Sequence, residues 1–478
     1  MLSILVNFAR ICNESKEFAV ILRDIPFVPD VEGELHKPSE LYDIEIPELR
    51  LLLKDEQHVF PCEMFAAPMV LSSLRKLGLR DVLSRTTILE CASSISLIDK
   101  LDVESIRKRA TCLLRYVDGH SKDLFTVPKR SLLSTLTMKS DSPSKNAAGQ
   151  IERFSQELMG ISWVPVITSN PNENLPWRDG GVGKLETRLP REVRPESEMW
   201  LCSYSLGILR GNIQSLYLKQ FFGWDKTIDP RIVAMQLVVL GQSYIPSEQL
   251  SRELSIQVPK LYKSLSNSCA ANPNAIQNIK QILSGTKWVW CGDSFVADED
   301  VAFLTPVNAK PHLYKVPRDM AIGFGNLFKN LGVREEFGFA DFANALSRMH
   351  LKYKDKPLEK LDVDIAVSLV QELSNTPIKA ANFEIFAPNE DNVMMPTRAM
   401  VYDDAPWLSK RAIATSSGNN TQFIHPKISN EVAKNVEAKS FRSTLIANET
   451  EDLLDDFDAT SFGQVEPLTG RLNHILQL

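Results

Sequence analysis

The stretch KWVWCGDSFVADEDVAFLTPVNAKPHLYKVPRDMAIGFGNLFKNLG (287–332) contains the local signals on which the fold prediction depends. Trp288 and Trp290 alternate with Val289, as in a strand whose successive side chains point to opposite faces. Gly292-Asp293 is a turn dipeptide, and Phe295 begins a second strand-forming run. We therefore expect a short β-hairpin over 287–297.

A helix with a glycine cap is expected at the end of the same stretch. Pro311 and Pro317 bracket an extended link. Beyond them, apolar residues fall at helical spacing on one face: Met320, Phe324, Leu327, Phe328 and Leu331. Gly332 is the expected C-terminal cap, because glycine adopts the left-handed conformation at little cost. The unit is thus strand, turn, strand, helix, cap.

Weaker copies of this unit occur on both sides of it. LRKLGLR (74–80) matches FKNLGVR (328–334) at an offset of 254 residues. A third copy begins in FEIFAPNEDNVMMPTRAMVYDDAPWL (383–408), where Pro388 matches Pro29 of the first copy. Tyr402-Asp403 likewise matches Tyr42-Asp43. These correspondences predict internal duplication, and their unequal spacing argues against a regular solenoid.

The third copy differs from the first at one informative position. Gly78 lies 49 residues after Pro29, and the same distance from Pro388 leads to Glu437. A glutamate cannot adopt the left-handed conformation as cheaply as a glycine. We therefore expect the helix there to run on or to bend differently.

The predicted fold class is α+β, with helix-dominated modules that carry short β-hairpins, repeated about three times in an elongated multi-module array. Residues 137–150 have lost apolar periodicity and are predicted to be a linker. The expected domains are a first repeat module (1–136), the linker (137–150), a mainly helical middle region (151–285), a second repeat module (286–376) and a third (377–478).

Composition favours a soluble intracellular protein. The 478 residues are 44% hydrophobic and carry a net charge of −6, which argues against a nucleic acid or an anionic membrane as the main partner. The cysteines show no CxxC pair, and no segment approaches the length of a membrane span. A cytoplasmic location is expected. The densest basic triplet, Arg107-Lys108-Arg109, is interpreted as a solvated helix face.

The sequence offers no convincing catalytic, cofactor or metal site, and we do not expect an enzyme. Residues 179–183 (DGGVG) fit the loose DxGxG pattern of a GHKL-type ATP site, but the upstream helix such a site needs is missing. Gly292-Asp293-Ser294 resembles an esterase nucleophile block without its downstream Asp-x-x-His. A surface loop and a hairpin turn are the better interpretations of these two segments.

Aromatic side chains beside prolines and in short strands are the candidates for a protein-binding surface. The residues proposed for it are Trp288, Trp290, Phe295, Tyr314, Tyr402 and Trp407. The alternative, which is the commoner role of such residues, is that they form the cores of small modules that lack long elements.

Taken in order, the motifs resemble the repeats of the sacsin family of giant cochaperones. The matching residues are Trp288-Val289-Trp290, Phe295-Val296, Pro311-His312-Leu313-Tyr314, Leu331-Gly332-Val333, residues 402–408 (YDDAPWL), His425-Pro426, and FGQ (462–464) with Glu466, Leu468-Thr469 and Arg471. Glu437 departs from the family's Leu-Gly-Val pattern. The resemblance covers nearly the whole chain.

The resemblance implies a segment that lies between two GHKL-type ATPase domains and leads into one that the chain lacks. It implies that no nucleotide-binding residue of the family can be assigned here. Protein folding and quality control is the implied process, with client proteins and heat-shock chaperones as partners. The alternatives are a passive scaffold that spaces domains in a large ubiquitin-pathway protein, and a degenerate ATPase that uses the loop at Asp179.

Overall fold

The computed structural model of the protein describes residues 16–98, 102–125, 143–177, 186–376, 383–406 and 421–444. The chain divides into two compact units, which are described separately below. The first comprises Met1–Trp288 and Gly292–Phe295, and the second Val289–Cys291 and Val296–Leu478. The division falls within the hairpin predicted at 287–297.

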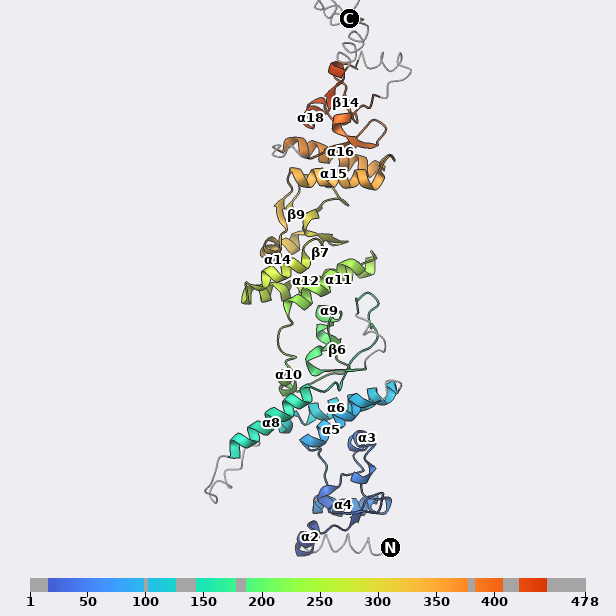
Figure 1. The fold of residues 1–478 in the computed structure, drawn as a ribbon, viewed down its shortest axis with the longest axis vertical. Helices are drawn as coiled ribbons and strands as arrows, with labels where there is room; N and C mark the ends of the chain where they lie inside the picture. The colour runs from blue at the N-terminus through green and yellow to red at the C-terminus, as the bar shows by residue number, and fades with distance from the viewer. Residues whose placement is uncertain are drawn as a thin grey trace, which may run out of the picture. The chain divides into compact units, whose positions relative to one another are not determined.

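Helices predominate, and the strands are short and arranged in small sheets (Figure 1). The predicted class, helix-dominated α+β, is confirmed. A similar order of elements recurs along the chain: a β-hairpin, a 3-10 turn, an extended segment, a helix, and a second extended segment that pairs in parallel with the first; further short elements intervene before the helix in some copies. We call each occurrence a hairpin module. Internal duplication itself stays a prediction.

The first hairpin module pairs Val28 with His36 and Pro29 with Leu35, and its last pairing is a parallel bridge between Tyr42 and Arg80. Its elements are β1 (Val28–Pro29), β2 (Leu35–His36), η1 (Pro38–Glu40) and α4 (Pro68–Leu77).

The second hairpin module also lies in the first unit, and the strands β5 and β6 form its parallel pair. Its elements are β3 (Val164–Pro165), β4 (Thr187–Arg188), η5 (Pro190–Glu192), β5 (Val193–Arg194), η6 (Glu196–Glu198), α9 (Met199–Cys202) and β6 (Gly207–Ile208).

The third hairpin module begins with the strands β7 and β8, and the central strand β9 of its sheet pairs in parallel with both β10 and β11. Its elements are β7 (Lys287–Trp290), β8 (Phe295–Ala297), η7 (Asp298–Asp300), β9 (Val301–Leu304), β10 (Tyr314–Lys315), α14 (Arg318–Leu331) and β11 (Arg334–Glu336). In the fourth, Val401 pairs with Lys439 and Tyr402 with Ser440. Its elements are β12 (Phe386–Pro388), β13 (Met394–Pro396), η8 (Thr397–Ala399), β14 (Val401–Tyr402), α18 (Asn430–Asn435) and β15 (Lys439–Ser440).

In three of these modules, the helix is followed by a residue in the left-handed conformation. Gly78 after α4 has φ +105°, and Gly332 after α14 has φ +115°. Glu437 has φ +64° and follows α18 at the corresponding place. The expectation that the helix runs on or bends differently at Glu437 was therefore wrong. Surrounding contacts hold the glutamate in the conformation that glycine adopts elsewhere.

The helices between modules begin at recognisable caps. The side chains of Ser84, Asp102, Ser215, Asp229 and Ser247 each accept a hydrogen bond from a backbone N–H of the first turn. In the first unit the remaining helices are α2 (Lys16–Arg23), α3 (Pro47–Leu52), η2 (Gln57–Val59), η3 (Glu63–Ala66), α5 (Arg85–Leu97), α6 (Val103–Gly119), α7 (Ser121–Phe125), α8 (Pro143–Met159), α10 (Leu216–Phe222), α11 (Pro230–Ser243), α12 (Glu248–Ala271) and α13 (Ala275–Leu283). In the second they are α15 (Phe339–Tyr353) and α16 (Lys360–Asn375).

Two features of the structure bear on the expected domains, whose boundaries stay a prediction. Helix α8 begins at Pro143, so it occupies the second half of the predicted linker at 137–150. Proline suits the first helical turn, and the alanines at 147 and 148 favour helix, which outweighs the polar composition of this segment. The middle region at 151–285 also contains four strands, β3 to β6, that helical periodicity could not reveal.

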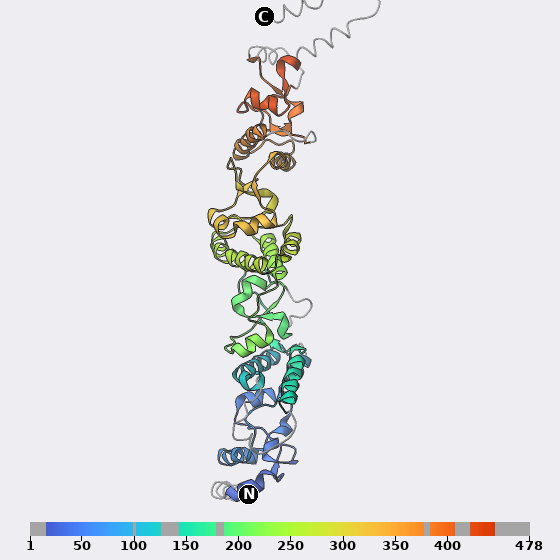
Figure 2. The same ribbon diagram turned by 90° about the vertical axis from the view of Figure 1, so that its left-hand side faces the viewer.

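Each unit has its own apolar cores. In the first, one core joins side chains from Tyr42 to Trp224, and a smaller one joins β1 to α4. In the second, the main core extends from Ala302 to Ala438 and includes the facing sides of α15 and α16. Figure 2 shows the same elements after a quarter turn. Within the described ranges, no helix combines the length and the apolar character that crossing a bilayer requires.

Candidate functional site

The aromatic residues proposed for a protein-binding surface lie mostly in the interior. Trp288, Trp290 and Phe295 are 0%, 1% and 5% exposed. The Tyr262 hydroxyl donates a hydrogen bond to the carbonyl oxygen of Trp288 at 2.8 Å, and the Tyr262 ring packs edge-on against the Trp288 ring. These three residues are therefore core residues, and their assignment to an exposed surface was wrong. Large aromatic side chains allow strands of three or four residues to bury much apolar area.

The other three proposed residues do not complete such a surface. Tyr314 on β10 and Tyr402 on β14 are half-buried and belong to different sheets. Trp407 lies outside the described residues, as do the DGGVG loop at 179–183 and the FGQ motif at 462–464. The described residues thus do not gather the six aromatics at one place.

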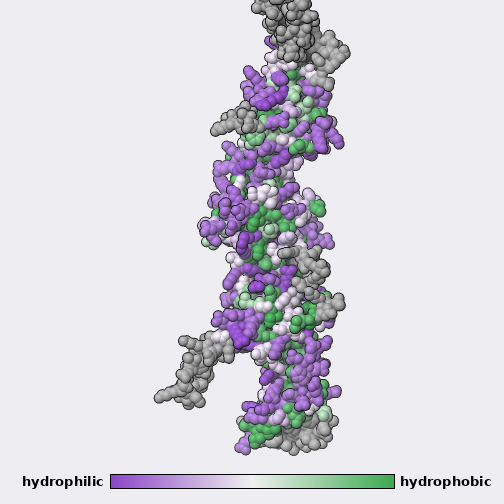
Figure 3. Space-filling model, in the orientation of Figure 1, coloured by the Kyte–Doolittle hydropathy of each residue, from purple (hydrophilic) through white to green (hydrophobic). Residues whose placement is uncertain are grey.

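Several exposed apolar side chains lie in the first hairpin module and in the helix before it. We call this set the N-terminal apolar surface; its members are Val20, Ile21, Ile25, Val31, Leu35, Met64 and Met69, which are 43–62% exposed. They lie on elements that pack together, because α4 contacts both α2 and η3. Figure 3 shows hydrophobic surface in the region of α2.

The basic triplet on α6 is divided between the interior and the surface. Arg109 is 4% exposed: its Nη1 donates to Asp55 Oδ2 at 2.6 Å, and its Nη2 donates to the Leu52 carbonyl oxygen at 2.9 Å. The interpretation of the whole triplet as a solvated face was therefore wrong. The carboxylate and the carbonyl, with the Ser94 hydroxyl, give partners to both terminal nitrogens of this buried guanidinium and offset part of the cost of burying it.

Arg107 is held by a carboxylate from the second hairpin module. Its Nη2 and Nε donate to the two oxygens of Glu186 at 3.1 and 3.3 Å, in a bidentate pair. These hydrogen bonds raise the pKa of Arg107. Lys108 pairs with Glu104 one turn earlier at 3.2 Å. Sequence spacing could not reveal the first pair, because 79 residues separate its partners.

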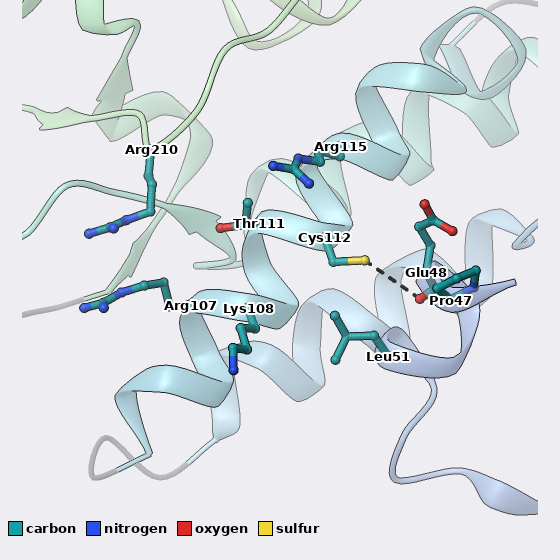
Figure 4. A pocket seen from close by; sticks show the side chains of 9 residues that line it. All are labelled: Pro47, Glu48, Leu51, Arg107, Lys108, Thr111, Cys112, Arg115 and Arg210. Carbon is teal, nitrogen blue, oxygen red and sulfur yellow. Dashed lines mark hydrogen bonds between the residues drawn. The ribbon is translucent and has the colours of Figure 1, made fainter.

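A pocket of about 430 Å³ opens beside these residues in the first unit (Figure 4). Four cationic side chains line it: Arg107, Lys108 and Arg115 from α6, and Arg210 from the turn after β6. Three residues of α3 line the pocket as well: Pro47, Glu48 and Leu51. We call it the α6 basic pocket.

The inner wall of the α6 basic pocket includes Cys112. Its thiol donates a weak hydrogen bond to the Glu48 carbonyl oxygen at 3.8 Å. Burial, with the nearby Glu48 charge, raises the pKa of Cys112 to about 11. The thiol is protonated and unreactive at neutral pH, so Cys112 lines the pocket and does not act as a nucleophile.

The second unit contains a polar cluster around Asp362 at the start of α16. His312 Nε2, Tyr353 Oη and Lys352 Nζ contact its carboxylate at 3.1, 2.5 and 3.2 Å. Burial alone would raise the pKa of Asp362, but these hydrogen bonds outweigh it and lower the pKa. The cluster ties the loop before β10 to α15 and α16. Within the part of the chain that the structure describes, no group of His, Cys, Asp and Glu is placed to hold a metal ion.

These features define a helix-rich α+β protein with recurring hairpin modules and a basic pocket in its first unit. The chain is 24% identical to human sacsin over 483 aligned residues, which cover 96% of this chain and 10% of sacsin. This similarity confirms the resemblance to the sacsin family that the motifs indicated. The chain spans about a tenth of the length of the curated relative it matches. No family model matches the chain. No solved structure matches it.

Proposed function

We propose that this chain is a non-catalytic segment of a sacsin-like chaperone or cochaperone that acts in protein folding and quality control in the cytoplasm. The observation that carries the proposal is the similarity to sacsin along 96% of the chain. Its partners are client proteins and heat-shock chaperones, as the family resemblance implies. The proposal assigns it no cofactor and no bound nucleic acid or membrane.

The N-terminal apolar surface supports the client-binding part of the proposal. Partly unfolded proteins expose apolar segments, and a surface with several exposed apolar side chains can cover them. Leu35 and Met69 are 58% and 62% exposed, so neither contributes to a core that substitution would disturb. They are the residues of choice for testing client contact.

Light scattering of a heat-aggregating client protein tests this proposal, with the full chain at an equimolar ratio and with and without ATP. Suppression of aggregation that does not depend on ATP is expected. The double variant Leu35→Glu/Met69→Glu should lose most of this suppression. Its matched control is Ile256→Glu/Leu361→Glu, which places the same charges at apolar residues that are 64% and 65% exposed elsewhere.

If the wild-type chain leaves the aggregation of the client protein unchanged, the proposal that it binds clients is overturned. That result would favour the alternative function, a passive scaffold that spaces domains in a large ubiquitin-pathway protein. Equal losses in the double variant and its control would show that general surface hydrophobicity, and not the N-terminal apolar surface, suppresses aggregation.

A further inference from the structure

The α6 basic pocket is distinct from the N-terminal apolar surface, and its charges are only partly compensated. Glu186 neutralises Arg107, and Glu104 neutralises Lys108. Among the described residues, Arg115 has no carboxylate partner, and the Arg210 side chain donates only to the Val166 carbonyl oxygen. The pocket therefore presents two cations whose charge only Glu48 opposes from within its lining.

Part of the lining of the α6 basic pocket is apolar. Pro47 and Leu51 project from α3, and the aliphatic parts of Thr111 and Lys108 project from α6 (Figure 4). A volume of about 430 Å³ lies within the range of small ligand sites and accommodates a few side chains. The pocket thus combines an apolar lining with cations placed for carboxylates.

We propose that the α6 basic pocket binds a short acidic peptide segment of a partner protein, with an apolar side chain against Pro47 and Leu51 and carboxylates on Arg115 and Arg210. Charge complementarity carries this assignment, because guanidinium groups bind carboxylates in a matching planar geometry. The apolar lining distinguishes such a segment from a nucleic-acid backbone, which would need a more extended basic surface.

The rigidity of the surroundings favours recognition of a peptide. Arg107 is fixed by two hydrogen bonds to Glu186, and Arg109 beneath it anchors α6 to the segment after α3 through Asp55. A preformed pocket loses little conformational entropy on binding. The two walls are therefore in place before the ligand arrives.

Fluorescence anisotropy with the full chain tests the proposal, using a short labelled peptide in which glutamate alternates with leucine. We expect saturable binding that weakens as salt is added. Arg115→Glu should weaken binding by about five- to tenfold, because an attraction to the peptide carboxylates becomes a repulsion at this exposed site. Thr111→Trp, which fills the pocket without changing its charge, should weaken it similarly at both low and high salt.

Two controls make the test specific. Arg153→Glu reverses an exposed helical arginine of the same unit, and it should change the affinity less than about twofold. A peptide in which serine replaces every leucine should bind at least about fivefold more weakly, because it cannot use the apolar lining.

The proposal is overturned if the glutamate-leucine peptide shows no saturable binding, or if Arg115→Glu and Arg153→Glu weaken it equally. It is also overturned if the serine peptide binds as tightly as the leucine peptide, since charge alone would then explain the association. Far-ultraviolet circular dichroism of Thr111→Trp and Arg115→Glu establishes that both variants are folded. The measurement does not depend on suppression of client aggregation, so the two proposals can fail separately.

Discussion

The first and fourth hairpin modules share a backbone pattern but differ in the residues that produce it. In the first, Gly78 is the left-handed residue after α4, and the Leu79 N–H donates back to the Leu74 carbonyl oxygen at 2.9 Å. In the fourth, Glu437 is the left-handed residue, and the Ala438 N–H donates to the Ala433 carbonyl oxygen at 3.0 Å. Both helices thus end in a Schellman motif.

A similar correspondence holds where each hairpin begins its turn. Asp30 accepts hydrogen bonds from the backbone of Glu32 and Glu34, and Asn389 accepts one from the backbone of Val393. Asp43 and Asp403 each accept a hydrogen bond from the backbone N–H two residues later. The comparison indicates that side-chain hydrogen bonds and helix caps preserve the backbone conformation at the hairpin turn and at the end of the helix. The residue types at these positions differ between the two modules.

The largest effect on stability is expected from substituting the buried residue in the last turn of α4 and of α18. Leu74 and Ala433 are both 0% exposed. Leu74→Ala leaves a cavity beside α4 and should lower the free energy of unfolding by about 2–5 kcal/mol. Ala433→Leu overfills its site and should cost about 1–3 kcal/mol. Hydrogen exchange followed by mass spectrometry measures each module separately, since the two units need not unfold together.

The control for this pair is Met69→Ala, on the same helix but 62% exposed, which should change stability by less than about 0.5 kcal/mol. A cost below about 1 kcal/mol for Leu74→Ala would mean that the small core between β1 and α4 does not stabilise the first module.

A smaller effect is expected from transferring the glutamate cap to the first module. A Cβ on Gly78 would lie 3.7 Å from the Ser39 Cβ, an ordinary contact, so Gly78→Glu meets no steric overlap. A glutamate in the left-handed conformation at this position should still lower the free energy of unfolding by about 1–2 kcal/mol. In the fourth module Arg398 pairs with Glu437 at 2.7 Å. Ser39→Arg/Gly78→Glu should therefore recover up to about 0.5 kcal/mol in urea unfolding.

The double variant tests whether the two positions act together. Ser39→Arg alone is the control, and by itself it should be close to neutral. If the double variant is less stable than the sum of the two single changes, the arginine does not support a left-handed glutamate.

The reverse change should have a smaller effect still. Glu437→Gly removes the left-handed strain but increases the flexibility of the unfolded chain. We expect a gain of no more than about 1 kcal/mol in the stability of the fourth module. Arg398→Ala, which removes only the exposed ion pair, should cost less than about 0.5 kcal/mol. A loss above about 1 kcal/mol for Glu437→Gly would show that the glutamate side chain, and not the backbone conformation, secures the end of α18.

The smallest effect is limited to acidic pH. Burial by itself would raise the pKa of Asp30, but hydrogen bonds from His36 and from the backbone of Glu32 and Glu34 lower it below the ordinary value. A lowered pKa contributes stability above the unfolded pKa, and this contribution is lost as pH falls below about 4. The fourth hairpin has Asn389 at the corresponding place and lacks this dependence.

Hydrogen exchange of the first hairpin between about pH 5 and pH 3, corrected for intrinsic rates, should therefore show a loss of protection that the fourth hairpin does not share. Asp30→Asn should abolish the difference between the two hairpins. An equal loss in both, unaffected by Asp30→Asn, would contradict the role given to the Asp30 carboxylate.

Features that depend on neighbouring residues were predictable. The hairpin at 287–297, the helix that ends at Leu331 and the caps at Gly78 and Gly332 follow from alternation, helical spacing and the conformational freedom of glycine. The 49-residue spacing from Pro388 also led to the correct position, 437, although the conformation expected there was wrong. The second hairpin module has no glycine at the cap of its helix α9, so the cap signal that marks the first and third modules is missing from its sequence.

The sequence by itself determined the helix-dominated α+β class, the short hairpins and the resemblance to sacsin, because each depends on local spacing or on the order of motifs. Only the tertiary structure decided the burial of Trp288 and Arg109, the left-handed conformation of Glu437 and the convergence of Arg107 with Arg210. These depend on partners tens of residues away, and contacts of that kind override local preference when they satisfy a buried charge or fill a core.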